Sequence, residues 1–276
     1  MLRIDAHQHF WKYDPVKDRW ITDEMKVLRN NFLPADLKPV LQENKIDGCV
    51  AIQADQSEEE TKFLLELAQK NDFIAGVVGW IDFRSPNLKK KLQLLASCVK
   101  LKGFRHILQS ESQRDCMLRE EFKNGIAQLA HFNYTYDFLI YPDQLPYSLL
   151  LSQQFPEQKF VVDHLAKPFI KFKKKDEWAN DITQIARCKN VYCKLSGFIT
   201  EADWTDWTEE EFYPYFDIVV NAFGTDRVMF GSDWPVCLLG GSYEEVVGIV
   251  NQYFSSFTMD EKEKVFAKNA IQFYNL

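Results

Sequence analysis

The chain has 276 residues, 46% of them hydrophobic, a length that suits two small domains or one large α/β barrel. Its formal net charge of −7 excludes the basic face of a nucleic-acid-binding protein. Six cysteines lie scattered without a Cys-x-x-Cys pair, the start MLRID has no apolar signal segment, and the apolar runs are shorter than the roughly 20 residues of a membrane helix. We therefore expect a cytoplasmic protein with reduced thiols and with neither nucleic-acid nor membrane partners.

Eight short β-rich runs recur along the chain, each followed by a longer segment with helical spacing. Several runs are apolar almost throughout, as expected for parallel strands that are covered on both faces. From His9 to Asp233, seven repeats span 224 residues, or 32 residues each, which matches the length of a βα unit. In chain order the predicted strands are residues 2–10, 47–55, 73–83, 101–108, 135–141, 159–166, 190–197 and 227–236.

Three of the intervening segments begin with a capping-box sequence. In this sequence a hydroxyl and a later glutamate satisfy the free N–H groups at the start of a helix. The three are SEEE at 57–60, SYEE at 242–245 and TMDE at 258–261. They predict that helices begin there, which supports the alternation of strands and helices.

Eight alternating units without a composition break or a linker predict one domain over residues 1–276 with the α/β fold of a (β/α)8 barrel. The alternative is an open, doubly wound sheet, for which a glycine-rich turn is expected after the first strand. The first strand instead leads into HQHFW, which contains no glycine. The sequence therefore favours the closed barrel.

Polar and aromatic residues gather near the predicted carboxyl ends of the strands, where (β/α)8 barrels carry their catalytic groups. Four of the five histidines belong to this set, and His131 lies in a helical segment. We expect Asp5, deeper in its strand, to be a structural anchor, and Asp163 to face away from His164 if both lie on a regular strand. The set comprises His7, His9, Gln53, Asp55, Trp80, Asp82, Arg105, His106, Tyr141, His164, Lys194, Ser196 and Asp233.

One combination within this set has the composition of a metal site. Residues i and i+2 of a strand share a face, so His7 and His9 can point at one object, although a chance pair in a polar segment is the alternative. With His164 and Asp233, these histidines would bring three imidazoles and one carboxylate to the barrel axis. This ligand set suits zinc or a similar divalent ion.

The sequence resembles the amidohydrolase superfamily, and within it the lactonase-like branch that includes L-fuconolactonases, L-rhamnonolactonases and pyrone dicarboxylate lactonases. The pair DHLAKP and GSDWP at this distance is the strongest signal. The resembling segments cover nearly the whole chain in order: IDAHQHFW, RWITDEMKVLRNNFLPADL, FIAGVVGWIDF, GFRHILQ, VVDHLAKP, CKLSG and FGSDWPV.

The resemblance implies roles for four residues. His7 and His9 correspond to the histidine pair of the first strand, His164 to a barrel histidine, and Asp233 to the aspartate that activates water. Binuclear members carry a carboxylated lysine on the fourth strand, where this chain has GFRHIL. We therefore expect either one divalent metal ion, with zinc as the first candidate, or no metal.

The resemblance predicts hydrolysis of a sugar lactone, such as L-fuconolactone or a related aldonolactone. Asp233 would be the general base, and a metal would polarise the carbonyl or activate water. Without a metal, the histidines, His164 included, could donate to the oxyanion. The predicted substrate contacts are Arg105, His106, Tyr141, Trp80 and Trp234.

Two other functions fit the same fold. A metal-dependent decarboxylase would release carbon dioxide without consuming water. A catalytically silent barrel acting as a binding protein would be expected to have lost one of the four central residues, and all four are present. The sequence leaves open which lactone is used and whether the chain forms a homo-oligomer.

Overall fold

The computed structural model describes residues 1–276 and contains one eight-stranded sheet in which every strand runs parallel to its neighbours in the order β1 to β8. Each strand lies within one of the eight predicted runs, so the predicted strands and the barrel class are confirmed. Their bounds are β1 Ile4–Gln8, β2 Gly48–Ile52, β3 Ile74–Gly79, β4 Leu101–His106, β5 Thr135–Phe138, β6 Phe160–Val162, β7 Val191–Leu195 and β8 Val228–Phe230.

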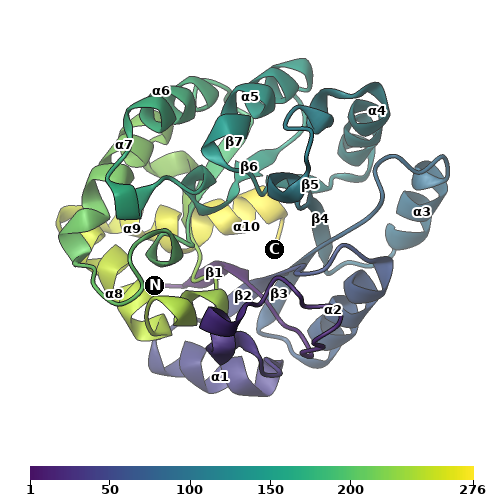
Figure 1. Cartoon of the computed structure of the whole chain (residues 1–276). Helices are drawn as coiled ribbons and strands as arrows, with labels where there is room; N and C mark the ends of the chain where they lie inside the picture. The colour runs from purple at the N-terminus through teal and green to yellow at the C-terminus, as the bar shows by residue number, and fades with distance from the viewer.

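Helices form an outer ring around the strands (Figure 1). The strands are buried on both faces because they face this ring on one side and the barrel interior on the other. No helix has the length and apolar content needed to cross a membrane. The α-helices are α1 Pro34–Glu43, α2 Glu58–Lys70, α3 Leu88–Leu95, α4 Glu120–Leu129, α5 Leu145–Gln154, α6 Asp176–Ile185, α7 Tyr213–Phe223, α8 Tyr243–Tyr253, α9 Met259–Glu263 and α10 Asn269–Tyr274.

The predicted capping boxes begin three of these helices. Ser242 and Thr258 exchange both hydrogen bonds with the glutamate three residues later. Ser57 accepts from the backbone N–H of Glu60, but the Glu60 carboxylate accepts from the backbone N–H of Ala54 instead. The first box is therefore not reciprocal, because Glu60 links α2 to the segment that follows β2.

The barrel closes just after the last strand. The backbone N–H of Asp233 donates to the carbonyl oxygen of His7 at 2.8 Å, and the N–H of His9 donates to that of Trp234 at 2.7 Å. We call this contact between β1 and residues 231–234 the closure seam. It sets Asp233 directly beside His7 and His9, although more than 220 residues separate them in the sequence.

Asp5 holds the closure seam from below. Its carboxylate accepts from the Ser232 hydroxyl at 2.6 Å and backbone N–H at 2.9 Å, and from the Tyr243 hydroxyl at 3.1 Å. Burial is the main cause that raises the Asp5 pKa to about 6. The prediction that Asp5 is a structural anchor is confirmed.

The opposite end of the barrel is covered by α10, which crosses the centre of the ring of strands in Figure 1. Phe273 and Tyr274 belong to a buried apolar cluster with inward-facing residues of β1 and β2, among them Ile4 and Val50. The Tyr274 hydroxyl donates to Asp137 of β5 at 2.6 Å. This end is therefore filled, and open space remains only toward the carboxyl ends of the strands.

Candidate active site

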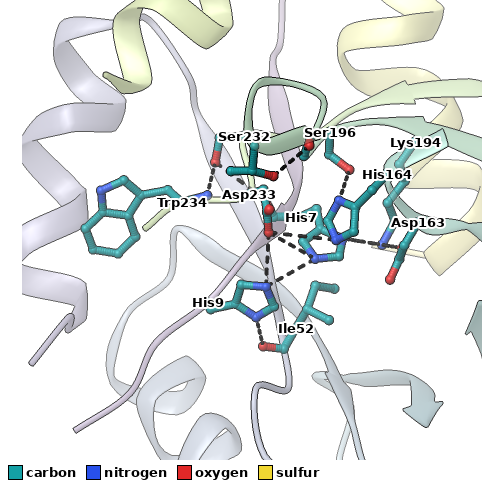
Figure 2. Close-up of polar contacts among 12 residues, drawn as sticks. His7, His9, Ile52, Asp163, His164, Lys194, Ser196, Ser232, Asp233 and Trp234 are labelled. Atoms are coloured by element: carbon teal, nitrogen blue, oxygen red, sulfur yellow. Dashed lines mark hydrogen bonds and ion pairs between the residues drawn. The ribbon is translucent and has the colours of Figure 1, made fainter. Parts of the chain in front are cut away.

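Three imidazoles surround one carboxylate at the carboxyl end of the barrel (Figure 2). The Nε2 atoms of His9, His7 and His164 lie 3.3, 3.7 and 3.9 Å from Oδ1 of Asp233. The Nε2 atoms of His7 and His9 are 3.3 Å apart. The structure thus brings together the four residues that the sequence placed at one centre.

Each imidazole is oriented through its other ring nitrogen. Nδ1 of His9 lies 2.8 Å from the carbonyl oxygen of Ile52, which can only accept, so Nδ1 donates to it. Nδ1 of His164 lies 2.9 Å from the Ser196 hydroxyl. Nδ1 of His7 faces the ammonium of Lys194 at 3.2 Å. These contacts aim all three Nε2 atoms at Asp233.

The segment after β6 leaves the strand through an unusual turn. Residues 164–167 all have positive φ, between +52° and +57°, and the backbone N–H of Lys167 donates to the carbonyl oxygen of His164 at 2.7 Å. None of them is glycine, although left-handed backbone costs other residues roughly 1–2 kcal/mol each. The turn sends the side chains of both His164 and Lys167 to the barrel mouth.

Asp163 and His164 were predicted to face opposite ways on condition that both lie on a regular strand. That condition is not met, because β6 ends at Val162. Both side chains instead approach His7: Oδ1 of Asp163 lies 3.4 Å from its Nδ1, and the His7 and His164 ring centroids are 4.3 Å apart.

A buried network of charges lies beneath His7. The Lys194 ammonium lies 2.6 Å from Asp137 and 2.9 Å from Asp163, and the Arg105 guanidinium lies 3.0 Å from Asp163. Two cations therefore balance two carboxylates that are fully buried. Such pairing is required because an isolated charge in the interior is costly.

The electrostatics of the site favour an ionised carboxylate at Asp233. Burial lowers the pKa values of His7 and His164 well below the usual value, and the cations Lys194 and Arg105 add to this effect at His7. Burial opposes ionisation of Asp233, but His164, His9 and Lys167 outweigh it and hold the pKa of that carboxyl below its usual value. Asp233 is thus ready to accept a proton at neutral pH.

A cavity of about 300 Å³ opens above this centre. One part of its wall is apolar, with two tryptophans, and its base carries charged and polar groups. The lining residues are His9, Trp11, Trp20, Ala54, Arg105, Ile107, Gln109, Ser110, Leu139, His164, Lys167, Asp233 and Val236. The combination of apolar walls and a few convergent polar groups is typical of a small-molecule site.

Of the five predicted substrate contacts, Arg105 is in this lining and the other four lie elsewhere. The Trp80 indole donates to Nδ1 of His106 at 3.2 Å, and Nε2 of His106 lies 2.7 Å from Glu111. Tyr141 is 39% exposed and borders a separate depression with Arg114.

Trp234 is buried and points away from the Asp233 carboxylate in Figure 2. It packs edge-on against Phe10 and Phe32. Its backbone contributes to the closure seam, while its ring belongs to the hydrophobic core.

Lys167 is not among the predicted site residues, and its ammonium pairs with Glu201 at 3.1 Å. Burial would lower its pKa, but Glu201 and Asp233 raise it above the usual value, so Lys167 is a cation. Its place in DHLAKP, three residues after His164, was the available signal. Trp20, in the long segment after β1, likewise lies in the resembling segment RWITDEMKVLRNNFLPADL.

The donor atoms of the centre fit one divalent ion. The ligand atoms of His7, His164 and Asp233 all lie within 4.8 Å of one another, and Nε2 of His9 adds a fourth. Tetrahedral zinc, with bonds of about 2.0–2.2 Å, places its ligand atoms roughly 3.3–3.6 Å apart. One contact competes, since Nη1 of Arg105 lies 3.2 Å from Nε2 of His7.

The chain matches the family model described as amidohydrolase over residues 4–276. It is 37% identical to the L-fucono-1,5-lactonase of Burkholderia multivorans over 286 aligned residues, covering 100% of this chain and 96% of that protein. It is 26% identical to the L-rhamnono-gamma-lactonase of Scheffersomyces stipitis over 200 residues, which is 64% of this chain and 59% of the relative.

The fold is also that of a solved structure. A crystal structure of an amidohydrolase from Burkholderia multivorans with bound zinc superimposes with a TM-score of 0.97 at 37% identity, covering 100% of both chains. The architecture described above is thus shared over the full length of the chain.

Proposed function

The chain belongs to the amidohydrolase family, and from this we infer that it is a lactonase, a hydrolase that opens a cyclic ester with water. The observation that carries this inference is the 37% identity to L-fucono-1,5-lactonase over the whole chain. The site agrees with it, since an ionised carboxylate stands at the base of a cavity of small-molecule size.

We propose L-fucono-1,5-lactone, or a closely related aldonolactone, as the substrate. The cavity offers an apolar wall that includes Trp11 and Trp20, and polar groups at its base. A sugar lactone has the same division, with C–H faces that pack on aromatic rings and oxygens that need hydrogen bonds. Of the five predicted contacts only Arg105 is among the residues that line the cavity, where its guanidinium is held by Gln53 and Asp163.

In the proposed reaction Asp233 is the general base. It accepts a proton from the attacking water and returns it to the ring oxygen, which leaves as a hydroxyl. His9 supports this role, because its Nε2 lies 3.3 Å from the carboxylate. His164 is held by Ser196 on the other side of the centre and keeps the carboxylate in place.

We further propose that His7, His9, His164 and Asp233 can hold one divalent ion, for which zinc suits the nitrogen-rich ligand set. When bound, such an ion supplies a Lewis acid that polarises the carbonyl or lowers the pKa of water to about 7. Binding at His7 requires the Arg105 contact to its Nε2 to give way. The contacts of Nδ1 with Ile52 in His9 and with Ser196 in His164 would keep these two rings in position.

The test is a panel of aldonolactones followed with a pH indicator, because ring opening releases a proton at neutral pH. We expect turnover of L-fucono-1,5-lactone, and Asp233→Asn should abolish it while the thermal unfolding midpoint stays close to that of the parent. Full activity of this variant would contradict the assignment of the base.

The same panel is run after treatment with a chelator and after addition of zinc. Loss of turnover that zinc restores would support a catalytic ion. Unchanged turnover would assign the reaction to the side chains alone. A parallel assay offers aromatic carboxylic acids, because an aldonolactone has no carboxylate to lose. Release of carbon dioxide from these acids, with no lactone opened, would replace the lactonase assignment by a decarboxylase.

A further inference from the structure

Lactone opening places negative charge on the carbonyl oxygen, and the cavity must supply donors that stabilise it. Donors fixed near such an oxygen are commonly a large part of catalysis. The cationic and imidazole groups that line the cavity are Arg105, His9, His164 and Lys167. Their existing hydrogen bonds decide which of them has N–H groups to give.

Arg105 has little to give. Its Nε and Nη2 donate to the side chain of Gln53, and Nη2 also donates to the Gln53 carbonyl oxygen. Its Nη1 faces both Asp163 and His7. All three guanidinium nitrogens are therefore engaged within the barrel, and Arg105 is held as part of the buried charge network.

The histidines are also poorly suited. Nδ1 of His9 donates to the carbonyl oxygen of Ile52, and its Nε2 lies 3.3 Å from the Asp233 carboxylate, so both ring nitrogens are engaged. Nε2 of His164 faces the Asp233 carboxylate at 3.9 Å, which would accept any proton it carries. Neither ring offers a donor that is free for the substrate.

Lys167 differs from these groups. Its ammonium has three N–H donors, and the structure records one hydrogen bond for it, to Glu201 at 3.1 Å. Its side chain and that of Glu201 are only 18% and 19% exposed, so water competes weakly for the remaining donors. The left-handed turn fixes the backbone of Lys167 three residues after His164, on the same cavity.

We propose that Lys167 is a catalytic residue whose ammonium donates hydrogen bonds to the lactone carbonyl oxygen as it becomes an oxyanion, and that Glu201 is the positioning residue that holds this ammonium. The proposal rests on the proposed lactonase function. It also explains why four consecutive residues without a glycine adopt the costly left-handed backbone conformation, since this turn places Lys167 at the cavity.

The reaction balances with these groups. Water attacks the carbonyl carbon, its proton passes to Asp233, and the electron pair of the C=O bond moves to the oxygen that Lys167 contacts. The pair then returns as the bond to the ring oxygen breaks, and the proton on Asp233 passes to that oxygen. The product is a hydroxy acid, whose carboxyl group ionises and lies beside Lys167.

The same loop contains a matched control. Lys171 pairs with Asp203 at 2.9 Å, as Lys167 pairs with Glu201, and both acids follow β7. Lys171 lies outside the cavity lining and its side chain is 51% exposed. A substitution there removes a loop ion pair without touching the cavity.

The experiment compares Lys167→Met with Lys171→Met in steady-state hydrolysis of L-fucono-1,5-lactone. We expect kcat of Lys167→Met to fall by roughly 10²–10³-fold, as for loss of one oxyanion donor, with a much smaller change in KM. Lys171→Met should retain the parental kcat and KM. Thermal unfolding tests whether each variant is folded. If Lys167→Met does not fold, Lys167→Gln takes its place in the comparison.

Chemical rescue separates catalysis from structure. Lys167→Cys treated with 2-bromoethylamine regains an ammonium at nearly the same position, and kcat should rise again, while treated parent protein controls for the native cysteines. Glu201→Gln should lower kcat less than Lys167→Met, and Glu201→Asp should restore part of the loss.

If folded Lys167→Met keeps the parental kcat, whether loaded with zinc or treated with chelator, this proposal is wrong. The proposed lactonase function would not be affected by that result. A large loss that aminoethylation fails to repair overturns it as well, since Lys167 would then be structural. If the parent protein opens no lactone of the panel, the proposed function itself has failed.

Discussion

His164 can hold its orientation only because the residue opposite its ring has no side chain. Gly197, directly after the Ser196 that contacts Nδ1 of His164, has a φ of +60°. A Cβ at Gly197 would lie 2.5 Å from that Nδ1. At the scale of residues, therefore, the site depends on the missing side chain at Gly197 as well as on its charged groups.

We predict that Gly197→Ala lowers kcat/KM about 10²-fold, because a shift of about 1 Å in a catalytic group costs this much. The left-handed backbone adds a loss of stability of about 1 kcal/mol. Gly248→Ala in α8 is the control, since its Cβ meets nothing within 4 Å. Steady-state kinetics and thermal unfolding of both variants test this, and unchanged kinetics of Gly197→Ala would refute the packing argument.

At the scale of elements, the junction between β2 and α2 holds a buried acid away from the catalytic centre. Glu60 is 7% exposed, and its carboxylate accepts from the backbone N–H of Ala54. Burial is the main cause that raises its pKa from 4.5 to about 7. The start of α2 is therefore tied to β2 by a group that ionises near neutral pH.

Because folding raises this pKa, the Glu60 contribution to stability is complete below pH 4.5 and is lost as the pH rises through about 7. The shift corresponds to at most about 3 kcal/mol. Glu60→Gln stays neutral, so we predict that it gains stability relative to the parent as the pH rises from about 5 to about 7.5. Urea unfolding at the two pH values measures this, and a constant difference would disprove it.

At the scale of the whole molecule, one end of the barrel contains the catalytic groups and the other end contains a packed hydrophobic cluster. The catalytic groups lie at the carboxyl ends of the strands, whereas α10 fills the other end through Phe273 and Tyr274. Phe273 is 1% exposed and packs on Tyr192 with ring centroids 4.9 Å apart. Stability and chemistry can thus be changed separately.

We predict that Phe273→Ala lowers the free energy of unfolding by about 3–5 kcal/mol, since it opens a cavity in a packed cluster. The folded fraction should keep the parental KM, because this cluster lies at the end opposite the mouth. Phe172→Ala, where the ring is 67% exposed, should change stability by less than about 0.5 kcal/mol. Denaturant unfolding compares the two, and equal losses would contradict the division.

The strands and the central residues could be predicted because they follow from regular repetition. Alternating strands of similar spacing imply a barrel, and a barrel brings the ends of its strands together, so His7 and Asp233 meet despite their separation. The turn at residues 163–167 could not be predicted, since no glycine announces its left-handed backbone. The direction of the Lys167 side chain could therefore not be predicted, although DHLAKP contains this residue.

The sequence also did not predict which side chains at the strand ends contact one another. Trp80 and His106 end neighbouring strands and contact one another, so their place at strand ends did not distinguish a pair from a substrate contact. Which polar groups face the cavity depends on side-chain packing, and a period along the chain does not contain that information.

The closure seam has a consequence for synthesis of the protein on the ribosome. β8 emerges more than 220 residues after β1, so the histidine pair and Asp233 remain apart until that length of chain has been made. Closing so long a loop carries an entropic cost that only the finished set of strands can offset. The catalytic centre can therefore form only after the last strand has been made. A nascent chain that stops before β8 contains seven of the eight strands and lacks Asp233.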